Sequence, residues 1–400
     1  MDYKSTENWV LSRLPSYQAI GEKAYNPGIN NVVKFVSTLN LPIDSLNLIH
    51  VGGTNGKGST SSYISSILQE SDYQVGVFSS PHFFDFRERI KINNQKIRKS
   101  FIVDFVNKNK STIEELELSF FELSFCISLA YFINNGVDYA VIEVGLGGRL
   151  DATNIINPLI SVITNISHDH TDILGNTLEM IALEKAGIFK KNSCIIIGER
   201  NDAVDEIFIK KAKEVSSKIT FVPDYNDQKQ YSTVNYLNTN IKTAIYACKA
   251  LNTENVNNNS IMAGIFNINK NCHLIGRWST ISENPKVIFD AAHNQAGFRI
   301  ISSELEKVSY NKLHIILSFV KGKNIKELIA ELPSNSKIYY TSLNMERGMK
   351  LNELIQNVGR NIIFDDNTKR LLEVVKKDCT DKDLILITGS NFIAKNIYEK

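Results

Sequence analysis

The sequence predicts an α/β protein with two domains: a P-loop-type, mostly parallel sheet over residues 1–275 and a smaller Rossmann-like α/β domain over residues 276–400. Three observations support this prediction. The length of 400 residues exceeds the size at which one hydrophobic core usually stops growing. Apolar runs alternate with segments of helical periodicity, as in parallel sheets wrapped by helices. A glycine-rich loop also joins an early strand to an early helix.

The glycine-rich loop spans residues 52–60 and reads Gly-Gly-Thr-Asn-Gly-Lys-Gly-Ser-Thr. A buried strand is expected over residues 46–51, and apolar residues recur at helical spacing over residues 63–68. Glycines let backbone N–H groups approach an anion, Lys57 adds a mobile positive charge, and the helix points its positive end at the same place. The loop departs from the strict GxxxxGK[ST] pattern because Gly58 follows Lys57. It predicts a nucleotide site; the alternative is a glycine-rich turn with a solvated lysine.

The amino-acid composition limits the kinds of molecule that the protein is expected to bind. The 45 basic and 43 acidic residues nearly balance, which argues against nucleic acid and anionic membranes and favours a small-molecule substrate. The longest apolar stretch, residues 120–133, is broken by polar residues, so no membrane segment is expected. The five cysteines lack CxxC spacing, which favours reduced thiols in a cytoplasmic protein. These cysteines are Cys126, Cys194, Cys248, Cys272 and Cys379.

Four predicted strands of the first domain lead into polar residues. They span residues 46–51, 74–78, 139–142 and 159–164. The first leads into the phosphate loop, and the others lead toward Ser80, Glu143 and the Asp169-His170 pair. Ligands of open parallel sheets bind beyond the carboxyl ends of the strands, so these four segments are expected to meet at one site.

A magnesium site is expected at these strand ends. Glu143 is the first candidate ligand, because an acid beside a phosphate loop commonly holds Mg²⁺. Ser80 and His170 are further candidates, a hydroxyl being an ordinary magnesium ligand and an imidazole a less common one. The alternatives are a cap of the following glycine-rich turn for Glu143, a turn residue for Ser80, and a local hydrogen bond between Asp169 and His170.

A second domain is expected to begin near Gly276, after an asparagine-rich stretch over residues 252–271 in which periodicity fades. Its expected strands span residues 286–290, 313–319, 337–341 and 384–388, and a helix is expected over residues 367–377. A strand-end cluster at residues 290–294 follows, with Arg277 at its entrance. Alone, this cluster is typical of a helix cap with a turn; beside a nucleotide site it favours a cleft that closes over ATP.

Ten motifs occur in order along nearly the whole chain. They are residues 53–59 (GTNGKGS), 80–82 (SPH), 86–90 (FRERI), 121–122 (FE), 143–154 (EVGLGGRLDATN), 169–171 (DHT), 184–188 (EKAGI), 276–277 (GR), 290–294 (DAAHN) and 388–390 (TGS). On these motifs the chain resembles the bifunctional dihydrofolate synthase / folylpolyglutamate synthase family of the Mur ligase superfamily.

The resemblance implies roles for residues that match the family's motifs. The implied ATP-binding residues are Thr54, Asn55, Gly56, Lys57, Gly58, Ser59, Asn240, Arg277, Asp290 and His293. The implied ligands of two Mg²⁺ ions are Ser80, Glu143, His170 and Lys185, the last as a lysine carbamylated by carbon dioxide. The implied catalytic residues are Lys57, Lys185 and His170. The implied pterin or folate contacts are Ser119, Phe120, Phe121, Glu122, Leu150, Asp151 and Ala152, with a covering loop over residues 14–28.

The resemblance also implies a reaction: an ATP-dependent ligase adds L-glutamate to dihydropteroate, making dihydrofolate, and to reduced folates, making folylpolyglutamates, through an acyl phosphate. The resemblance also implies a monomer.

Three other functions are alternatives to the folate ligase. They are a Mur ligase acting on a cell-wall precursor, a P-loop kinase or GTPase, and an inactive nucleotide-binding descendant.

Several positions depart from the family pattern. Ala291 stands where the family usually has Gly, and Gln295 where it usually has Pro. Ser167-His168 replaces a Gly followed by an apolar residue, and Asn391 replaces a Leu or an aromatic residue. None of these departures replaces a residue with an assigned chemical role. We therefore expect them to change only the local geometry of the chain near the nucleotide.

Overall fold

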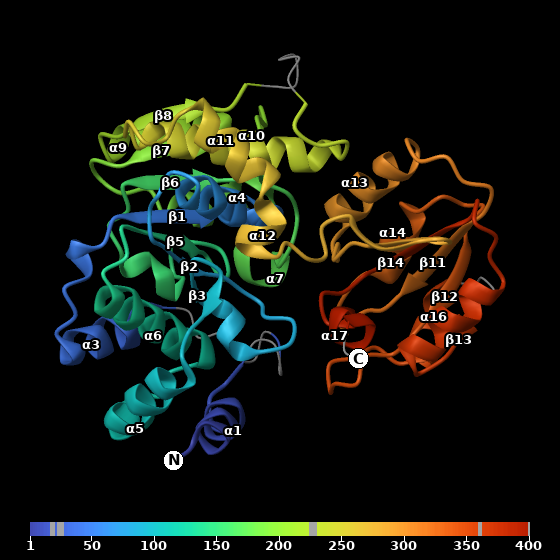
Figure 1. The fold of residues 1–400 in the computed structure, drawn as a ribbon, viewed down its shortest axis with the longest axis horizontal. Coiled ribbons are helices and arrows are strands. Elements are labelled where there is room, and N and C mark those ends of the chain that lie inside the picture. The colour runs from blue at the N-terminus through green and yellow to red at the C-terminus, as the bar shows by residue number, and fades with distance from the viewer. Residues whose placement is uncertain (17–20, 22–27, 224–229, 359–361, 399–400) are drawn as a thin grey trace. The chain divides into compact units, whose positions relative to one another are not determined.

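A computed structural model describes residues 1–16, 21, 28–223, 230–358 and 362–398. The chain folds as two compact units (Figure 1). The first unit comprises Met1–Thr233 and Leu237–Leu274, and the second comprises Val234–Tyr236 and Ile275–Lys400. Both units are α/β, which confirms the predicted fold class.

The first unit is built on an eight-stranded sheet with the order β4-β3-β2-β5-β1-β6-β7-β8. All neighbouring strands pair in parallel except β2 with β3 and β3 with β4, which are antiparallel. The strands are β1 Leu48–Gly52, β2 Val75–Phe78, β3 Ile90–Ile92, β4 Gln95–Lys96, β5 Tyr139–Glu143, β6 Ile160–Ile163, β7 Cys194–Ile197 and β8 Lys218–Phe221. The four predicted strands are therefore β1, β2, β5 and β6, and they lie side by side in the sheet.

Helices surround this sheet (Figure 1). They are α1 Tyr3–Arg13, α3 Asn30–Leu39, α4 Lys57–Gln69, α5 Lys99–Glu115, α6 Phe120–Asn135, α7 Thr171–Leu174, α8 Leu178–Ala186, α9 Asp205–Glu214, α10 Asn235–Ala250, α11 Asn258–Phe266 and α12 Ile268–Cys272. Short 3₁₀ helices span Ile43–Ser45, Phe86–Arg89 and Ala152–Ile155.

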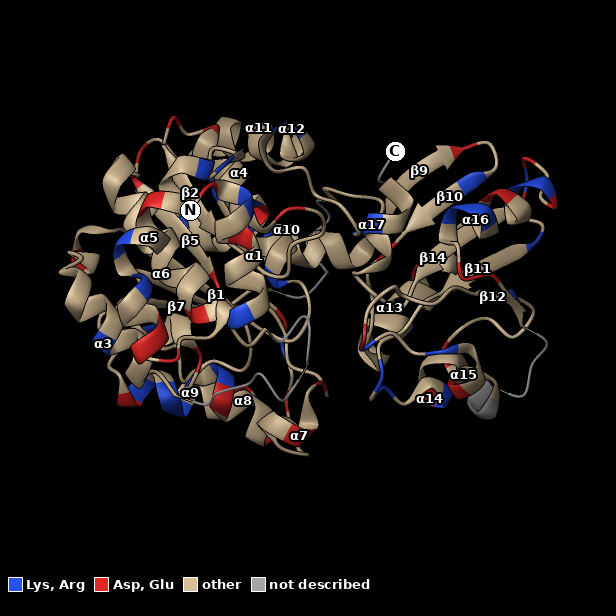
Figure 2. Cartoon of the chain, turned by 90° about the horizontal axis from the view of Figure 1, so that it is seen from below, with Lys and Arg blue, Asp and Glu red and all other residues tan. Residues whose placement is uncertain are grey.

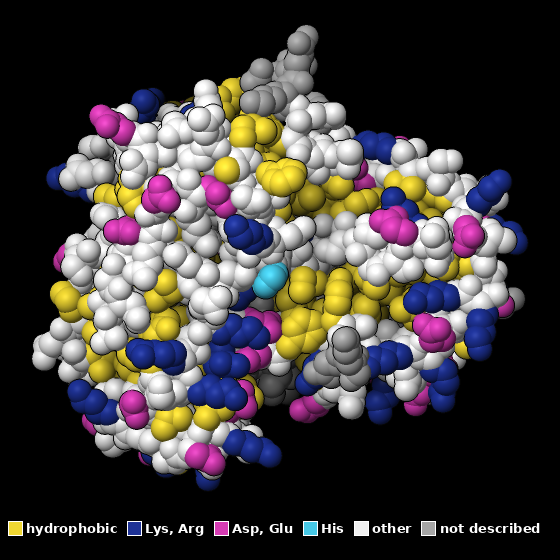
Figure 3. Space-filling view, in the orientation of Figure 1, with side chains coloured by type: hydrophobic (Ala, Val, Ile, Leu, Met, Phe, Trp, Pro, Cys, Tyr) yellow, Lys and Arg dark blue, Asp and Glu magenta, His cyan; other side chains and the backbone are white. Residues whose placement is uncertain are grey.

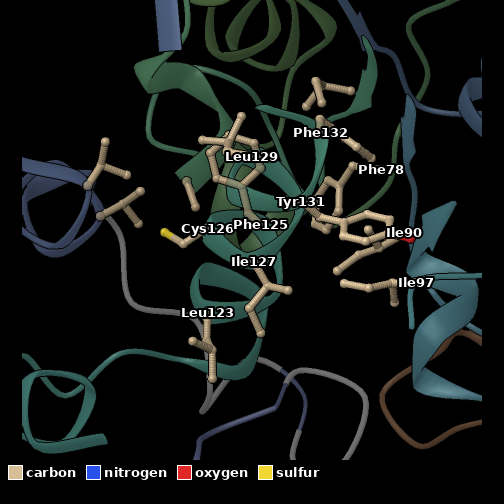
Figure 4. Packing of buried hydrophobic residues seen from close by; sticks show 14 of the residues in the cluster. Phe78, Ile90, Ile97, Leu123, Phe125, Cys126, Ile127, Leu129, Tyr131 and Phe132 are labelled. Carbon is tan, nitrogen blue, oxygen red and sulfur yellow. The ribbon is translucent and has the colours of Figure 1, made fainter. Parts of the chain in front are cut away.

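The apolar stretch that begins at Phe120 forms α6, a helix buried on nearly all sides. A capping box starts it, because the Ser119 hydroxyl accepts from the Glu122 N–H while the Glu122 carboxylate accepts from the Ser119 N–H. Gly76 of β2 lets the helix approach closely, since a Cβ there would lie 2.7 Å from the Phe132 ring. Phe125 packs on Phe78 of the same strand, with ring centroids 5.5 Å apart (Figure 4).

The asparagine-rich stretch is more ordered than its sequence indicates. It forms α11 and α12, because the Asn257 side chain accepts from the N–H groups of Asn259 and Ser260 and so starts a helix. Gly264 then packs directly against α4, where a Cβ would lie 2.5 Å from the Cα of Ile67. Ile261, Ile265 and Ile268 are also buried at helical spacing, so a short apolar stripe supports these helices.

The second unit holds a six-stranded sheet with the order β13-β12-β11-β14-β10-β9. Its strands pair in parallel except β9 with β10. They are β9 Ser279–Glu283, β10 Lys286–Phe289, β11 Leu313–Leu317, β12 Lys337–Tyr340, β13 Ile363–Phe364 and β14 Leu384–Thr388. The helices are α13 Gln295–Leu305, α14 Ile325–Ala330, α15 Leu351–Val358, α16 Thr368–Lys377 and α17 Ile393–Tyr398. All four predicted strands of this unit and the helix predicted over residues 367–377 are present.

Lys and Arg residues are interspersed with Asp and Glu residues along the chain in both units (Figure 2). On the face drawn in Figure 3, hydrophobic side chains lie among charged ones. In the described part of the chain, every helix is too short or too polar to traverse a lipid bilayer.

Candidate active site

The phosphate loop lies between β1 and α4, as its sequence predicts. Gly53 and Gly56 adopt φ values of 139° and 82°, a region that favours glycine. A Cβ at Gly56 would overlap the amide oxygen of Asn240, and one at Gly53 would overlap the hydroxyl of Thr164. Asn240, distant in sequence, therefore lies directly against the loop. Both glycines are required by the close approach of a neighbouring side chain as well as by their φ values.

The end of β6 holds the loop in place through residues that the sequence analysis did not single out. The carbonyl and the side chain of Asn165 accept from the N–H groups of Thr54 and Asn55, at 3.0 and 2.9 Å. The Thr164 hydroxyl donates to the Asn55 carbonyl at 2.6 Å. Asn165 directly follows a predicted strand, and that position was the only signal of its role in the sequence.

Two lysine ammonium groups converge on one carbonyl of the loop. Lys57 Nζ donates to the carbonyls of Gly53 and Thr54, at 3.0 and 3.1 Å, and Lys185 Nζ donates to the Gly53 carbonyl at 2.9 Å. Lys185 lies in the last turn of α8 and is buried. Burial, with a smaller contribution from the charge of Lys57, lowers the pKa of Lys185 to about 7.

Glu143 and Ser80 come together beside the first turn of α4. The Ser80 N–H donates to Glu143 Oε2 at 3.4 Å, and a Cβ at Gly58 would lie 3.6 Å from the same oxygen. Glu143 is buried, and Arg89 interacts with its charge. Asp151 also holds the glycine-rich turn, because its Oδ2 accepts from the Leu146 N–H at 2.8 Å.

The donor set at this place fits a hard divalent cation. A carboxylate and hydroxyl oxygens are the ligands that Mg²⁺ prefers. The Ser59 hydroxyl, at the start of α4, is buried and has no hydrogen-bond partner among the described residues. A buried polar atom of this kind is usually satisfied by a ligand, an ion or water. Glu143, Ser80 and Ser59 could therefore hold a cation or contact the groups that it binds.

His170 begins α7 with a left-handed backbone, φ 50°. Its N–H donates to Asp169 Oδ1 at 3.0 Å, and its Nε2 lies 3.8 Å from Asp169 Oδ2. The local Asp-His contact expected as the alternative is therefore present. Asp169 also interacts with the charge of Lys185, which connects this pair with the two lysines at the loop.

The stretch implied to contact the pterin has clear structural roles. Ser119 and Glu122 cap α6, and Phe120 is almost fully buried in the core. Phe121 is half-buried and packs on Gly145, where a Cβ would lie 2.5 Å from its ring.

The residues that follow the glycine-rich turn vary in exposure. Leu150 is half-buried, whereas Asp151 and Ala152 are buried. Asp151 Oδ1 accepts from the Thr153 N–H at 3.0 Å, and burial raises the pKa of this carboxyl. Of the covering loop over residues 14–28, positions 17–20 and 22–27 lie outside the described residues.

In the second unit, Asp290 follows β10 as the centre of a hydrogen-bond network. It accepts from the Tyr236 hydroxyl at 2.6 Å and from the N–H groups of Trp278 and Ala292, at 2.9 and 3.0 Å. Burial raises its pKa, and the charge of Arg277 opposes the shift.

The cluster at residues 290–294 was interpreted either as a helix cap with a turn or as part of a nucleotide site, and the residues next to Asp290 bear on this choice. Asn294 caps α13, so the helix-cap alternative holds for that residue. His293 Nδ1 lies 3.0 Å from the Ala291 carbonyl, and Gln295 donates to Glu331 at 2.8 Å. Ala291 is buried, with its methyl group 3.2 Å from the Cβ position of Gly276. The two departures from the family pattern are accommodated locally.

These features together define a nucleotide-type phosphate loop on a parallel sheet, followed by a second α/β unit. Residues 51–272 match the family model described as Mur ligase middle domain, and residues 276–391 match that described as Mur ligase, glutamate ligase domain. The architecture is therefore that of a Mur ligase.

Similar proteins indicate which family of Mur ligases the chain belongs to. A dihydrofolate synthase/folylpolyglutamate synthase from Buchnera aphidicola subsp. Schizaphis graminum is 32% identical over 86% of the chain and 85% of its own length. The protein of that name from Escherichia coli is 30% identical over 98% of the chain and 95% of its own length. The solved structure of E. coli FolC in complex with DHPP and ADP superposes with a TM-score of 0.84 at 27% identity, covering 99% and 97% of the two chains. The chain belongs to the dihydrofolate synthase/folylpolyglutamate synthase family, which confirms the resemblance.

Proposed function

We propose that the chain is an ATP-dependent ligase that joins L-glutamate to dihydropteroate and to reduced folates. The observation that carries the proposal is the convergence of Lys57, Lys185 and the Gly53 carbonyl in a glycine-rich loop at the carboxyl end of the sheet. The structure of E. coli FolC in complex with DHPP and ADP supports the proposal.

The loop supplies the site for the ATP phosphates. The N–H groups of residues 56–59, at the end of the loop and the start of α4, face the phosphate oxygens in this proposal, whereas those of Thr54 and Asn55 donate to Asn165. Lys57, folded back onto the loop carbonyls, moves to the phosphates when these provide a stronger acceptor. Asn240 lies against the loop and contributes to nucleotide binding, as do Arg277, Asp290 and His293 of the second unit.

Ser80, Glu143, His170 and a carbamylated Lys185 are the proposed ligands of two Mg²⁺ ions. When bound, Mg²⁺ neutralises the negative charge that phosphoryl transfer concentrates on the phosphates. The oxygen-rich donors and the buried Ser59 hydroxyl support this assignment. Lys57 adds charge that is independent of the metal, and Asn165 keeps the loop rigid so that these groups need not reorganise during the reaction.

The reaction proceeds in two steps. A carboxylate oxygen of the pteroate or folate attacks the γ-phosphorus of ATP, the bond to the β–γ bridging oxygen breaks, and ADP leaves from an acyl phosphate. The glutamate amine then attacks the acyl carbon, loses a proton, and expels phosphate as the amide forms. Residues 119–122 and 150–152 are the proposed pterin contacts, with the half-buried side chains of Phe121 and Leu150 as the most accessible of those apolar contacts.

Carbamylation of Lys185 would convert a cation into an anionic ligand. The neutral amine attacks carbon dioxide, a C–N bond forms, and one proton is released. Burial of Lys185 and its lowered pKa of about 7 support the proposal, because only the neutral amine is nucleophilic. Protein equilibrated with ¹³C-bicarbonate should give a carbamate carbon signal that is absent in Lys185→Arg. The same signal in both proteins would contradict the assignment.

The function is tested by ADP formation with Mg-ATP and L-glutamate, with dihydropteroate in one reaction and a reduced folate in a parallel one. Glutamate-dependent ADP release is expected with both substrates, and activity with one alone would restrict the assignment to that branch. Lys57→Gln is the control; the loss of a charge that stabilises the transition state should lower turnover about 10²–10³-fold. Intact ATP binding without turnover on either substrate would overturn the ligase assignment.

We also propose that the protein is a cytoplasmic monomer. All five cysteines are free, which suits a reducing compartment. Light scattering on the purified protein at several concentrations tests the oligomeric state.

A further inference from the structure

Three metal-ligating side chains gather in the second unit at the amino-terminal edge of its sheet. His314 is the second residue of β11, Cys379 follows α16, and Asp383 immediately precedes β14. One ligand atom from each lies within 4.8 Å of the other two. His314 and Asp383 are far apart in the sequence, and they meet only in the folded sheet, because β11 and β14 pair in parallel.

His314 has one nitrogen with a partner and one without. Its Nδ1 lies 3.0 Å from the Tyr339 hydroxyl, and its Nε2 is buried with no hydrogen-bond partner among the described residues. The side chain is 3% exposed. When Tyr339 accepts from Nδ1–H, the lone pair resides on Nε2. An imidazole whose other nitrogen is held by a hydrogen bond is the usual arrangement of a metal-ligating histidine.

Asp383 is held in place and retains accepting capacity. Its Oδ2 accepts from the N–H and hydroxyl of Thr380, at 2.8 and 3.0 Å, and its Oδ1 accepts from the Lys312 N–H at 3.0 Å. A carboxylate has about four lone-pair positions, so one on Oδ1 remains available. The loop between α16 and β14 is thereby fixed around the carboxylate, and Cys379 is part of that loop.

We propose that His314, Cys379 and Asp383 bind a divalent transition-metal ion of the zinc type through nitrogen, sulfur and oxygen. A thiolate and an imidazole favour Zn²⁺ over Mg²⁺ or Ca²⁺, which prefer oxygen ligands. Ligand atoms around a tetrahedral zinc ion are separated by about 3–4 Å, from bond lengths of roughly 2.0–2.3 Å. The observed cluster needs only a small contraction to reach this geometry. Three protein ligands leave a fourth position for water or another small ligand.

The charges of the ligand side chains also match that of a divalent cation. The Cys379 thiol loses its proton to the solvent as the sulfur–metal bond forms, so that thiolate and carboxylate together neutralise a divalent cation. Lys337 and Lys312 lie near the cluster and oppose binding, while Asp378 favours it. Lys337 is partly neutralised, because its Nζ lies 3.8 Å from Asp378 Oδ2.

The cluster is separate from the site proposed for ATP. Asp290 follows the carboxyl end of β10, whereas His314 and Asp383 lie at the amino ends of their strands. Since β10, β14 and β11 are parallel, these are opposite edges of one sheet. The inference therefore stands independently of the ligase assignment.

Cobalt(II) added to the metal-free full-length protein provides a direct test. A Co²⁺ ion bound to a thiolate has a sulfur-to-metal charge-transfer absorption, which an oxygen site lacks. The band is expected in the wild type and in Cys194→Ser, a control at another half-buried cysteine. It is expected to disappear in Cys379→Ser, and Tyr339→Phe should weaken cobalt affinity about 10- to 100-fold by freeing the imidazole. An unchanged band in Cys379→Ser, or no band in the wild type, would overturn the proposal.

Alkylation of the wild-type protein provides a second measurement. It requires no substitution, so the folding of a variant cannot affect its result. Iodoacetamide labelling of each cysteine is followed by peptide mass spectrometry with and without Zn²⁺. Zinc should slow labelling of Cys379 at least tenfold and leave Cys194 unchanged. Equal labelling of Cys379 under both conditions would also contradict the site, and circular dichroism of each variant establishes whether it is folded.

Discussion

At the scale of single residues, the phosphate loop depends on contacts from distant parts of the chain. Gly56 meets Asn240, Thr54 meets Asn165, and Gly53 receives both lysines. The loop residues themselves could be predicted from sequence, because glycine, lysine and the strand-helix order carry the signal. Asn165 could not be distinguished from any other residue after a strand, since its role arises from where β6 lies.

Gly56 can be tested against Gly136, which ends α6 with φ 60° and where an added Cβ would meet no atom within 4 Å. Alanine at either site should cost about 1–2 kcal/mol of folding free energy, because both glycines are left-handed. Gly56→Ala should also displace Asn240 and weaken ATP binding. Urea denaturation and ATP titration of both variants measure the two effects. Equal ATP affinity in the two proteins would contradict the role of Gly56.

At the scale of elements, the capped start of α6 and the buried strand β1 each contain a residue whose contribution to stability can be tested. The apolar stretch of residues 120–133 lies within α6, and this helix begins at a capping box. The box was not recognised from the sequence, although Ser119 and Glu122 have the spacing for one. The resemblance alone implies that these two residues contact the substrate, whereas the structure shows that they cap α6.

Ser119→Ala separates these two roles. Loss of the cap should reduce the free energy of unfolding by about 1 kcal/mol. A pterin contact would add an increase in the KM for dihydropteroate, whereas a purely structural role would leave KM unchanged. Asn257→Ala, which removes the cap of α11, is the control for stability alone. Denaturation curves and substrate titrations of both variants give the comparison.

His50 of the central strand β1 makes stability depend on pH. Burial, with a smaller effect from Lys190, lowers the pKa of His50 to about 3 from an ordinary value near 6.5. Between these values the unfolded chain binds more protons than the folded one, so stability falls as pH falls below about 6.5.

Replacement of His50 isolates this contribution. From pH 7 to pH 5 the wild type should lose about 2 kcal/mol more than His50→Gln, from roughly 1.4 kcal/mol per pH unit below 6.5. Urea denaturation at pH 7, 6 and 5 measures the difference. Identical pH slopes for the wild type and His50→Gln would refute the assignment.

At the scale of the whole molecule, the proposed reaction draws on both units. The first unit carries the phosphate loop, and the second carries Arg277 and the Asp290 network. Each unit has its own sheet and its own hydrophobic core. In the proposed reaction, the second unit contributes a few polar residues, Arg277 and Asp290 among them.

Arg277→Ala tests that contribution. Loss of a positive charge from the nucleotide should lower kcat/KM for ATP roughly 10²-fold, with the KM for the folate unchanged. Arg299→Ala is a matched control, because Arg299 also belongs to the second unit, on α13, but pairs with Glu331. Steady-state kinetics of both variants decide the matter; equal activity would remove Arg277 from the site.

The sequence by itself determined the α/β class, the main strands and the residues at their carboxyl ends. These follow from local signals: apolar runs, helical periodicity and glycine where phosphates approach. Tertiary structure alone decided which distant groups meet. It placed Asn165 beneath the loop, buried Lys185 enough to lower its pKa to about 7, and gathered His314, Cys379 and Asp383 at one sheet edge. Burial and contact between remote segments set desolvation and charge, and no local pattern of residues encodes them.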